Sequence, residues 1–177
     1  RKQIKNLNTT NQNHPGYLHG LPVVIKDLTN VKGVRTTYGS KIYKDHIPET
    51  SDFLVERIEQ MGGVIIGKTN TPEFGAGSQT FNEVFGETPN PWNLGYTSGG
   101  SSGGTASALA AGAAWLGTGS DLGGSLRNPA SFCGVVGIRT TPGTIIHGPQ
   151  NLPLNDLSVD GPMARNVEDI ALFLDTL

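Results

Sequence analysis

The sequence is poor in cysteine, in net positive charge and in long hydrophobic runs. A single cysteine among 177 residues cannot form an internal disulfide, so the chain lacks the framework of a disulfide-stabilised secreted domain. Its 13 lysines and arginines against 15 acidic residues give a net charge of -2, which argues against a nucleic-acid-binding surface and a polybasic membrane patch. No apolar run approaches the roughly 18 residues of a membrane span. At roughly 150 residues per domain, the length fits one domain or a large piece of one.

Motifs for metal ions and nucleotide cofactors are also missing. The four histidines show neither HxxxH nor HExxH spacing, so we expect no metal site. The run from Gly117 to Gly123 lacks the G-x-G-x-x-G spacing of a dinucleotide loop, and we expect no cofactor. Cys133 lies between Phe132 and Gly134, and we interpret it as a small buried hydrophobic residue rather than a nucleophile.

Glycine is the unusual component, with 25 residues, about twice the typical share of ~7%. Twelve of these glycines lie in the 43 residues from Gly95 to Gly137, mixed with alanine, leucine, valine and aromatic residues. Neither a collagen repeat nor a flexible linker has this composition. Only Asp121 and Arg127 are charged in this segment, so we expect it to be mostly buried with one ion pair inside. The pattern fits either a glycine-rich core with a structural ion pair or a functional site.

The order of hydrophobic patterns indicates an α/β fold. Residues 21–25 form a short β-branched run that predicts a buried strand. A helix is expected over 53–61, capped by Thr50 or Ser51, and a second strand over 64–68. Strand, helix and strand in this order favour a largely parallel sheet.

Further elements are expected downstream. Residues 74–96 contain several glycines and prolines and should be irregular. Residues 102–115 are rich in alanine and predict a tightly packed helix. Residues 134–140 are a strand candidate, and Asn166 is expected to cap a last amphipathic helix.

Serine residues offer two routes to nucleophilic chemistry. Residues 99–103 fit the G-x-S-x-G pattern of an α/β-hydrolase, in which Ser101 would attack, His147 would be the base and Asp121 would orient it. That arrangement needs a buried strand directly before the motif, and the preceding residues do not form one. Alternatively, a neutral lysine can activate a serine where an apolar environment removes its solvation, and Lys26 at the end of a predicted strand is the best candidate.

Several longer motifs resemble those of the amidase signature family. They include both halves of the glycine- and serine-rich signature, the lysine motif upstream and the block that follows it. In chain order the matching motifs are residues 20–27, 68–74, 99–104, 119–127 and 132–137. The spacings also fit, with 75 positions from Lys26 to Ser101 and 24 from Ser101 to Ser125. The resemblance runs from about residue 20 to residue 143.

The resemblance implies a serine-dependent mechanism. Ser125 would attack the amide carbonyl and carry the acyl group as an ester. Ser101, following a cis peptide bond after Gly100, would relay a proton between Ser125 and a neutral Lys26. Lys26 would act first as base and then as acid toward the leaving nitrogen.

Other residues are implied to bind the reacting group or to support the site. Backbone N–H groups of Leu122, Gly123, Gly124 and Ser125 would converge on the oxyanion, because glycine permits the unusual backbone conformation that this requires. A backbone group near Gly75 would line the acyl or leaving-group side. The implied supporting residues are the Asp121 and Arg127 ion pair with Thr97, Ser98 and Ser102.

The family fold is a mixed, largely parallel sheet with helices on both faces, in the α/β class. Complete members are longer, so residues 1–177 are expected to be the N-terminal and central portion of one amidase domain whose C-terminal part is missing. The chain also begins at Arg1, without a start Met or a signal peptide, which favours a segment of a longer chain.

The implied activity is hydrolysis of the C–N bond of a small-molecule carboxamide without a cofactor. A cytoplasmic location is expected, and a homodimer is compatible with this activity. One alternative is the glutamine-hydrolysing subunit of a tRNA-dependent amidotransferase, which would bring protein partners and a nucleic acid. Another is a non-catalytic interaction domain on the same scaffold, against which the intact Lys26, Ser101 and Ser125 argue.

Overall fold

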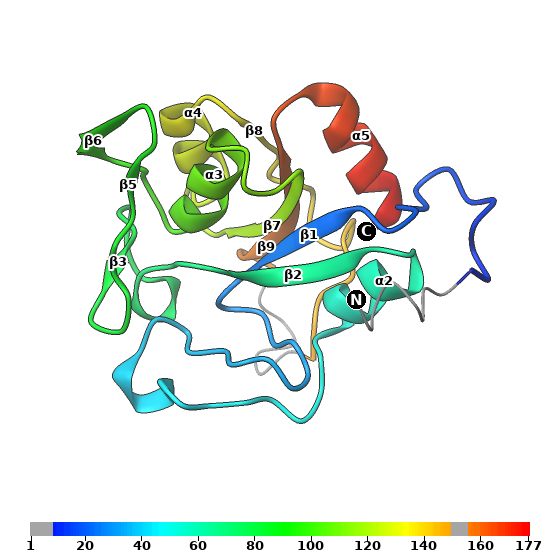
Figure 1. Cartoon of the computed structure of the whole chain (residues 1–177), viewed down its shortest axis with the longest axis horizontal. Helices are drawn as coiled ribbons and strands as arrows, with labels where there is room; N and C mark the ends of the chain where they lie inside the picture. Colours follow the sequence, from blue (N-terminus) through cyan, green and yellow to red (C-terminus); the bar gives the residue numbers. More distant parts are fainter. Residues whose placement is uncertain (1–8, 150–155) are drawn as a thin grey trace.

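The computed structural model describes residues 9–149 and 156–177 and has a five-stranded sheet at its centre (Figure 1). The strand order is β2-β1-β7-β9-β8. These strands are β1 (Pro22–Lys26), β2 (Val64–Thr69), β7 (Leu116–Asp121), β8 (Val136–Gly137) and β9 (Val159–Ala164). β1 pairs in parallel with β2 and β7, whereas β9 pairs antiparallel with β7 and β8. β9 therefore opposes the other four, which confirms the predicted mixed, largely parallel sheet.

Agreement with the sequence prediction differs among the strands. β1 and β2 lie within one residue of the predicted runs, whereas β8 covers two residues of the strand expected over 134–140. β7 was not predicted because glycine, a poor strand former, occupies two of its positions. A methyl group on Gly117 or Gly119 would lie 2.5 Å from Thr105 or Leu126, respectively. Close packing thus requires glycine in this strand.

The described residues contain four α-helices beside the sheet. They are α2 (Phe53–Gln60), α3 (Gly103–Ala110), α4 (Arg127–Cys133) and α5 (Val167–Thr176). Asn166 caps α5 as predicted, with its Oδ1 accepting from Asp169 N at 2.8 Å. The cap predicted for α2 is wrong, since the helix begins after Asp52 and the Ser51 hydroxyl accepts a hydrogen bond from Lys32 N instead.

Side-chain alternation along β1 divides the core into two layers. Val23 and Ile25 pack with apolar residues of α2 and α5, whereas Val24 packs with those of α3 and α4. Helices therefore cover both faces of the sheet, as expected, and α3 and α4 lie together in Figure 1. Because successive side chains of a strand point to opposite faces, Lys26 lies on the α3 side with Val24.

Residues 74–96, expected to be irregular, contain short strands that pair locally. β3 (Phe81–Asn82) pairs with β4 (Gly86–Glu87), and β5 (Pro89–Asn90) pairs with β6 (Asn93–Thr97). Two single-turn 3-10 helices, η1 (Lys41–Tyr43) and η2 (Glu73–Gly75), lie in the connections. Strands of two residues are too short to produce a readable alternation of hydrophobic residues.

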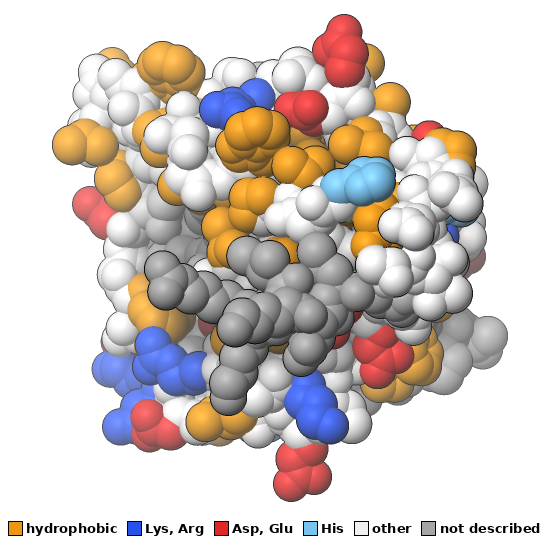
Figure 2. Space-filling model, turned by 45° about the vertical axis from the view of Figure 1, so that its right-hand side comes forward, with side chains coloured by type: hydrophobic (Ala, Val, Ile, Leu, Met, Phe, Trp, Pro, Cys, Tyr) orange, Lys and Arg blue, Asp and Glu red, His pale blue; other side chains and the backbone are white. Residues whose placement is uncertain are grey.

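The surface carries charges of both signs. On the face shown in Figure 2, hydrophobic side chains gather mainly over the upper half, and basic and acidic side chains lie near one another along the lower edge. Among the residues that the structure describes, no helix combines the length and the hydrophobicity needed to cross a membrane.

Candidate active site

Lys26 lies at the end of β1 with its side chain fully enclosed. The residue is 1% exposed, and its backbone N–H donates to Thr118 Oγ1 at 3.1 Å. Its Nζ is 2.7 Å from Ser101 Oγ, 2.9 Å from Ser102 Oγ and 2.9 Å from Ser120 Oγ. Within the described parts of the chain, no carboxylate oxygen lies within 4 Å of this nitrogen. The amine is therefore surrounded by hydroxyl groups, which can both donate and accept.

The environment of Lys26 favours its neutral form. Burial lowers the pKa of Lys26 to about 7, although the carboxylates of Asp160 and Asp121 act in the opposite direction. A large fraction of the amine is then unprotonated near neutral pH. Such an amine can accept a proton from a hydroxyl group in contact with it.

Ser101 is held by a glycine-rich turn before α3. The Gly100–Ser101 peptide bond is cis, and Ser101 is 2% exposed. A methyl group on Gly100 would lie 2.8 Å from Gln79 N, and one on Gly104 would lie 2.3 Å from Asn70 N. Backbone packs directly on backbone at these positions, so glycine is required there.

Ser125 belongs to a loop that runs from the end of β7 to α4. Its carbonyl accepts a hydrogen bond from Ser102 N at 3.2 Å, which places the loop against the segment that carries Ser101. Ser125 is half-buried, whereas Ser101 is buried. No hydrogen bond joins the hydroxyls of Ser125 and Ser101 among the residues described.

Asp121 anchors this loop from the end of β7. Its fully buried carboxylate accepts from Arg127 Nε at 3.0 Å and Arg127 Nη2 at 3.1 Å, so the two charged residues of the glycine-rich segment form a pair. Arg139, which sequence reasoning missed, also donates to Asp121. Burial acts to raise the pKa of Asp121, but the hydrogen bonds from Arg127 and from backbone N–H groups outweigh it and leave the pKa well below its usual range.

The backbone N–H groups of the loop divide into two sets. Gly124 N donates to Asp121 Oδ1 at 2.8 Å, so this N–H is already used and is not free for an oxyanion. In residues 9–149 and 156–177, no hydrogen bond partner is found for the N–H groups of Leu122, Gly123 and Ser125. Three of the four expected donors are therefore available.

Gly75 lies beside Ser101 and against Leu28, which follows β1 closely in the chain. A methyl group on Gly75 would lie 3.7 Å from Ser101 Oγ and 2.6 Å from Leu28 Cδ1. Its φ of +71° also favours glycine. The structure thus brings Gly75 together with Lys26 and Ser101, as the resemblance implied.

The supporting serines and threonines have different surroundings. Ser102 contacts Lys26 directly, whereas the buried Ser98 hydroxyl donates to Thr88 O at 2.7 Å. Thr97 is exposed and donates to Gln79. Ser120 contacts Lys26 but was missed by sequence reasoning, although it stands inside the 119–127 motif.

The hydrolase arrangement based on His147 does not form. The His147 ring is hydrogen-bonded to Asp160, and that bond raises the pKa of His147. Lys26, not His147, contacts Ser101. Cys133 is buried, as predicted, and burial raises the pKa of its thiol to about 11, so it is not an activated nucleophile.

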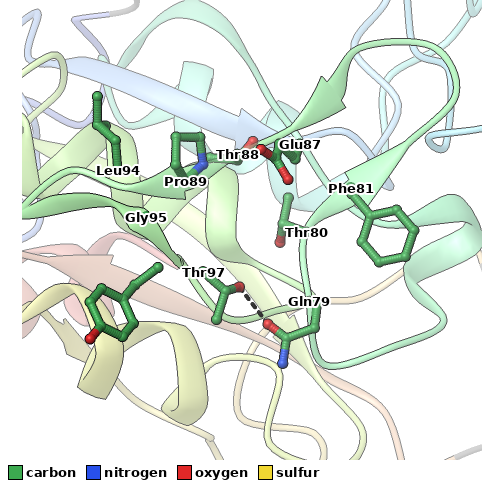
Figure 3. Close-up of a pocket in the computed structure, with 10 residues that line it drawn as sticks. Gln79, Thr80, Phe81, Glu87, Thr88, Pro89, Leu94, Gly95 and Thr97 are labelled. Carbon is green, nitrogen blue, oxygen red and sulfur yellow. Dashed lines mark hydrogen bonds between the residues drawn. The ribbon is translucent and has the colours of Figure 1, made fainter.

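A groove of about 360 Å³ lies beside the short hairpins (Figure 3). Its lining includes Gln79, whose backbone packs against Gly100. Gln79 and Thr97 point toward each other across it and share a hydrogen bond. Its lining is made by residues 79–81, 87–89 and 94–97. None of Lys26, Ser101 and Ser125 is among them, so this groove is separate from the lysine and serine cluster.

Comparison with known proteins gives a consistent result. A family model described as Amidase matches residues 1–177. The chain is 46% identical over 166 residues to one subunit of the glutamyl-tRNA(Gln) amidotransferase of Methanosarcina barkeri, an alignment that covers 94% of this chain and 35% of that relative. The chain therefore spans about a third of the length of such relatives.

Two solved structures share the fold. A bacterial aryl acylamidase of the amidase signature enzymes superposes with a TM-score of 0.88 at 31% identity, covering 100% of this chain and 38% of that one. A 6-aminohexanoate cyclic dimer hydrolase complexed with substrate superposes with a TM-score of 0.86 at 34% identity, covering 99% of this chain and 41% of that one.

Proposed function

This chain belongs to the amidase family, and from that premise we propose that the complete protein hydrolyses the C–N bond of a carboxamide through an acyl-enzyme on Ser125. The observation that carries the proposal is the contact of 2.7 Å between the buried Lys26 Nζ and Ser101 Oγ. Among the described residues no carboxylate pairs with this lysine; it is surrounded by hydroxyls and has a pKa of about 7, which are the properties of a general base.

The first half of the reaction forms the ester. Ser125 Oγ attacks the amide carbon while its proton passes to Ser101 Oγ, and the Ser101 proton passes to Lys26 Nζ. The reversed transfer protonates the leaving nitrogen, the C–N bond breaks, and ammonia or an amine departs. This sequence requires the Ser125 hydroxyl to contact Ser101 in the substrate complex, a contact that tightens on binding in many enzymes.

The second half consumes water. A water molecule attacks the ester carbon and gives its proton to Lys26 through Ser101, after which Ser125 recovers a proton and the carboxylate leaves. The net reaction converts an amide and water to a carboxylic acid and an amine, and the acid passes its proton to the amine or to solvent to become the carboxylate. The N–H groups of Leu122, Gly123 and Ser125 are the proposed oxyanion donors, and loss of one such donor typically costs about 2.7–4 kcal/mol of transition-state stabilisation.

The proposal is tested by labelling the complete protein with a fluorophosphonate and mapping the adduct. We expect the adduct on Ser125, and we expect Lys26→Ala to abolish labelling while His147→Ala leaves it nearly unchanged. An adduct on Ser101, or a protein that turns over amides without being labelled, would overturn the assignment. A protein that is neither labelled nor active would support the non-catalytic interaction domain.

A second candidate is the glutamine-hydrolysing subunit of a tRNA-dependent amidotransferase. The 46% identity to a relative of that name favours it. In this case Ser125 would carry a glutamyl group, and release of ammonia would depend on partner subunits and aminoacyl-tRNA. Turnover of simple amides by the complete protein alone favours the first candidate, whereas glutamine hydrolysis only in the presence of both partners favours the second.

We further propose that residues 1–177 supply the N-terminal and central portion of one amidase domain in a cytoplasmic protein. The short coverage of the relatives, 35% in one case, supports the need for further chain. The isolated segment should then be poorly stable and nearly inactive. A cooperative thermal transition of the segment, together with turnover of a simple amide, would contradict this.

A further inference from the structure

A small polar cavity adjoins the contacts of Lys26, and the proposed mechanism gives its charged residues no role. The cavity has a volume of about 140 Å³, and its lining includes Ser120, Asp52, His147 and Asp160. Ser120 Oγ is also 2.9 Å from Lys26 Nζ. One hydroxyl therefore contacts the proposed base and lines the same cavity as a carboxylate and a histidine.

Asp160 is the residue of β9 that stands directly opposite Ser120. β7 and β9 pair antiparallel, with Ser120 in register with Asp160. Side chains that are directly opposite in such a pair point to the same face and lie close together. The Asp160 carboxylate thus lies beside the residue whose hydroxyl contacts Lys26. Burial lowers the pKa of Lys26, and the charge of Asp160 opposes that shift.

His147 is the partner of this carboxylate. Its Nδ1 is hydrogen-bonded to Asp160 Oδ2, and the two side chains are 39% and 11% exposed. That hydrogen bond raises the pKa of His147, so the ring stays protonated to higher pH than an ordinary histidine. A protonated His147 offsets the charge of Asp160, whereas a neutral ring leaves it uncompensated.

Two further carboxylates lie close to these groups. Asp121 on β7 also acts on Lys26, but hydrogen bonds from Arg127 and backbone N–H groups outweigh its burial and hold its pKa well below the usual range. The charge of Asp121 is therefore constant near neutral pH. Asp52, at the start of α2, lines the cavity, and burial raises its pKa.

Lys68, the charged residue of β2, belongs to a separate ion pair. Its Nζ lies 2.9 Å from Asp27 Oδ1 and donates to Thr29 O at 2.7 Å and to Thr36 Oγ1 at 2.8 Å. Three acceptors match the three hydrogens of an ammonium group, so Lys68 and Asp27 compensate each other. Titration of His147, by contrast, changes the net charge of its own pair.

We propose that Asp160, together with His147, is a positioning residue that sets how readily Lys26 takes up a proton. A neutral pair leaves the amine uncharged, whereas an uncompensated Asp160 favours the ammonium form. Asp160 contacts no reacting atom in the proposed mechanism and acts through the charge state of Lys26. The inference rests on the proposed function, because a role of this kind requires Lys26 to act as the base.

The experiment measures how the rate of fluorophosphonate labelling of Ser125 depends on pH in the complete protein. Asp160→Asn removes the negative charge with little change of shape, His147→Gln removes its cation, and the double variant removes both. Asp45→Asn is the matched control, since Asp45 is an exposed carboxylate that pairs with Lys44 at the surface.

We expect Asp160→Asn to move the midpoint of the pH profile downward by about 0.6 units and to speed labelling at pH 6 about threefold, because the neutral amine persists to lower pH. A merely structural role predicts slower labelling instead. His147→Gln should move the midpoint upward by about 0.3 units and slow labelling at pH 6 about twofold, since a half-exposed histidine is partly screened by solvent. At pH 8, where Lys26 is mostly neutral, this variant should label nearly as fast as the wild type.

The effect of His147→Gln should disappear when Asp160→Asn is already present, because the histidine acts through that carboxylate. Asp45→Asn should leave the profile unchanged, since an exposed pair is screened by solvent.

An unchanged or higher midpoint in folded Asp160→Asn would overturn the inference, and so would equal slowing by His147→Gln with and without Asp160→Asn. Folding is checked by circular dichroism. If Asp160→Asn does not fold, His147→Gln alone carries the test, and no upward shift there would overturn the inference. A wild-type protein that is not labelled on Ser125 would instead refute the proposed function, so the two failures are distinguishable.

Discussion

Lys26 is fully buried and Lys68 is 10% exposed on the neighbouring parallel strand, yet their surroundings favour opposite charge states. Three hydroxyls surround Lys26 Nζ, and burial lowers its pKa to about 7. Burial lowers the pKa of Lys68 as well, but the carboxylate of Asp27 opposes that shift. The difference shows that the partners of a buried amine, more than burial itself, decide whether it is a base or a structural cation.

The two lysines should differ most in their contribution to kcat/KM. Lys26→Met should lower kcat/KM for an amide by at least about 10³-fold, because the proton relay loses its base. Lys68→Met should lower kcat/KM at pH 7 by less than about tenfold, since it leaves the base and its contact with Ser101 Oγ in place. Steady-state kinetics of the complete protein measure both, and equal losses in the two variants would mean that the lysines do not differ in role.

The order of the two variants should reverse in stability. Lys68→Met leaves Asp27 without its counter-ion and should lower the free energy of unfolding by about 3 kcal/mol. Lys26→Met replaces a buried, uncharged amine with a side chain of similar length and should change it by less than about 1 kcal/mol. Urea denaturation compares them, and a larger loss in Lys26→Met would contradict the assigned charge states.

The pH dependence of the wild-type activity tests whether Lys26 is the general base. Because its pKa is lowered to about 7, the active neutral form is lost as the pH falls through that value. We expect kcat/KM at pH 6 to be about tenfold below its value at pH 8. A profile that is flat between pH 6 and pH 8 would show that the base titrates elsewhere.

The smallest expected effect concerns the hydroxyls that distinguish the two sites. Ser120 Oγ lies 2.9 Å from Lys26 Nζ but plays no part in the proposed proton relay. Ser120→Ala should therefore lower kcat/KM about threefold to tenfold, the range expected for one lost hydrogen bond. Thr36→Val makes the matching change beside Lys68 and should alter kcat/KM less than Ser120→Ala does.

Part of the fold could be predicted from the sequence because it depends on local pattern. β1, β2 and α5 follow from β-branched runs and from the cap at Asn166. β7 and β9 could not be predicted, because glycine in β7 and Gly161-Pro162 in β9 contradict strand propensity. A methyl group on Gly161 would lie 2.3 Å from Ile138 O, a contact that only the folded chain creates.

The candidate site shows the same limit. The resemblance to the amidase signature family implies one site containing Lys26, Ser101 and Gly75, and the structure places both Lys26 and Gly75 beside Ser101. The motifs did not reveal that Gly124 N donates a hydrogen bond to the Asp121 carboxylate. They also did not reveal that Arg139 is a further donor to the same carboxylate. Both depend on how a buried carboxylate finds donors from distant parts of the chain, which residue types alone do not specify.

The anchoring of the loop by Asp121 also has a kinetic consequence. Hydrogen bonds from Gly124, Leu126 and Arg127 fix the backbone on both sides of Ser125 before any ligand arrives. The conformational entropy of these residues is lost during folding, so a ligand does not have to order them. Association of a transition-state analogue should then follow a single exponential whose rate rises linearly with ligand concentration, as in lock-and-key binding.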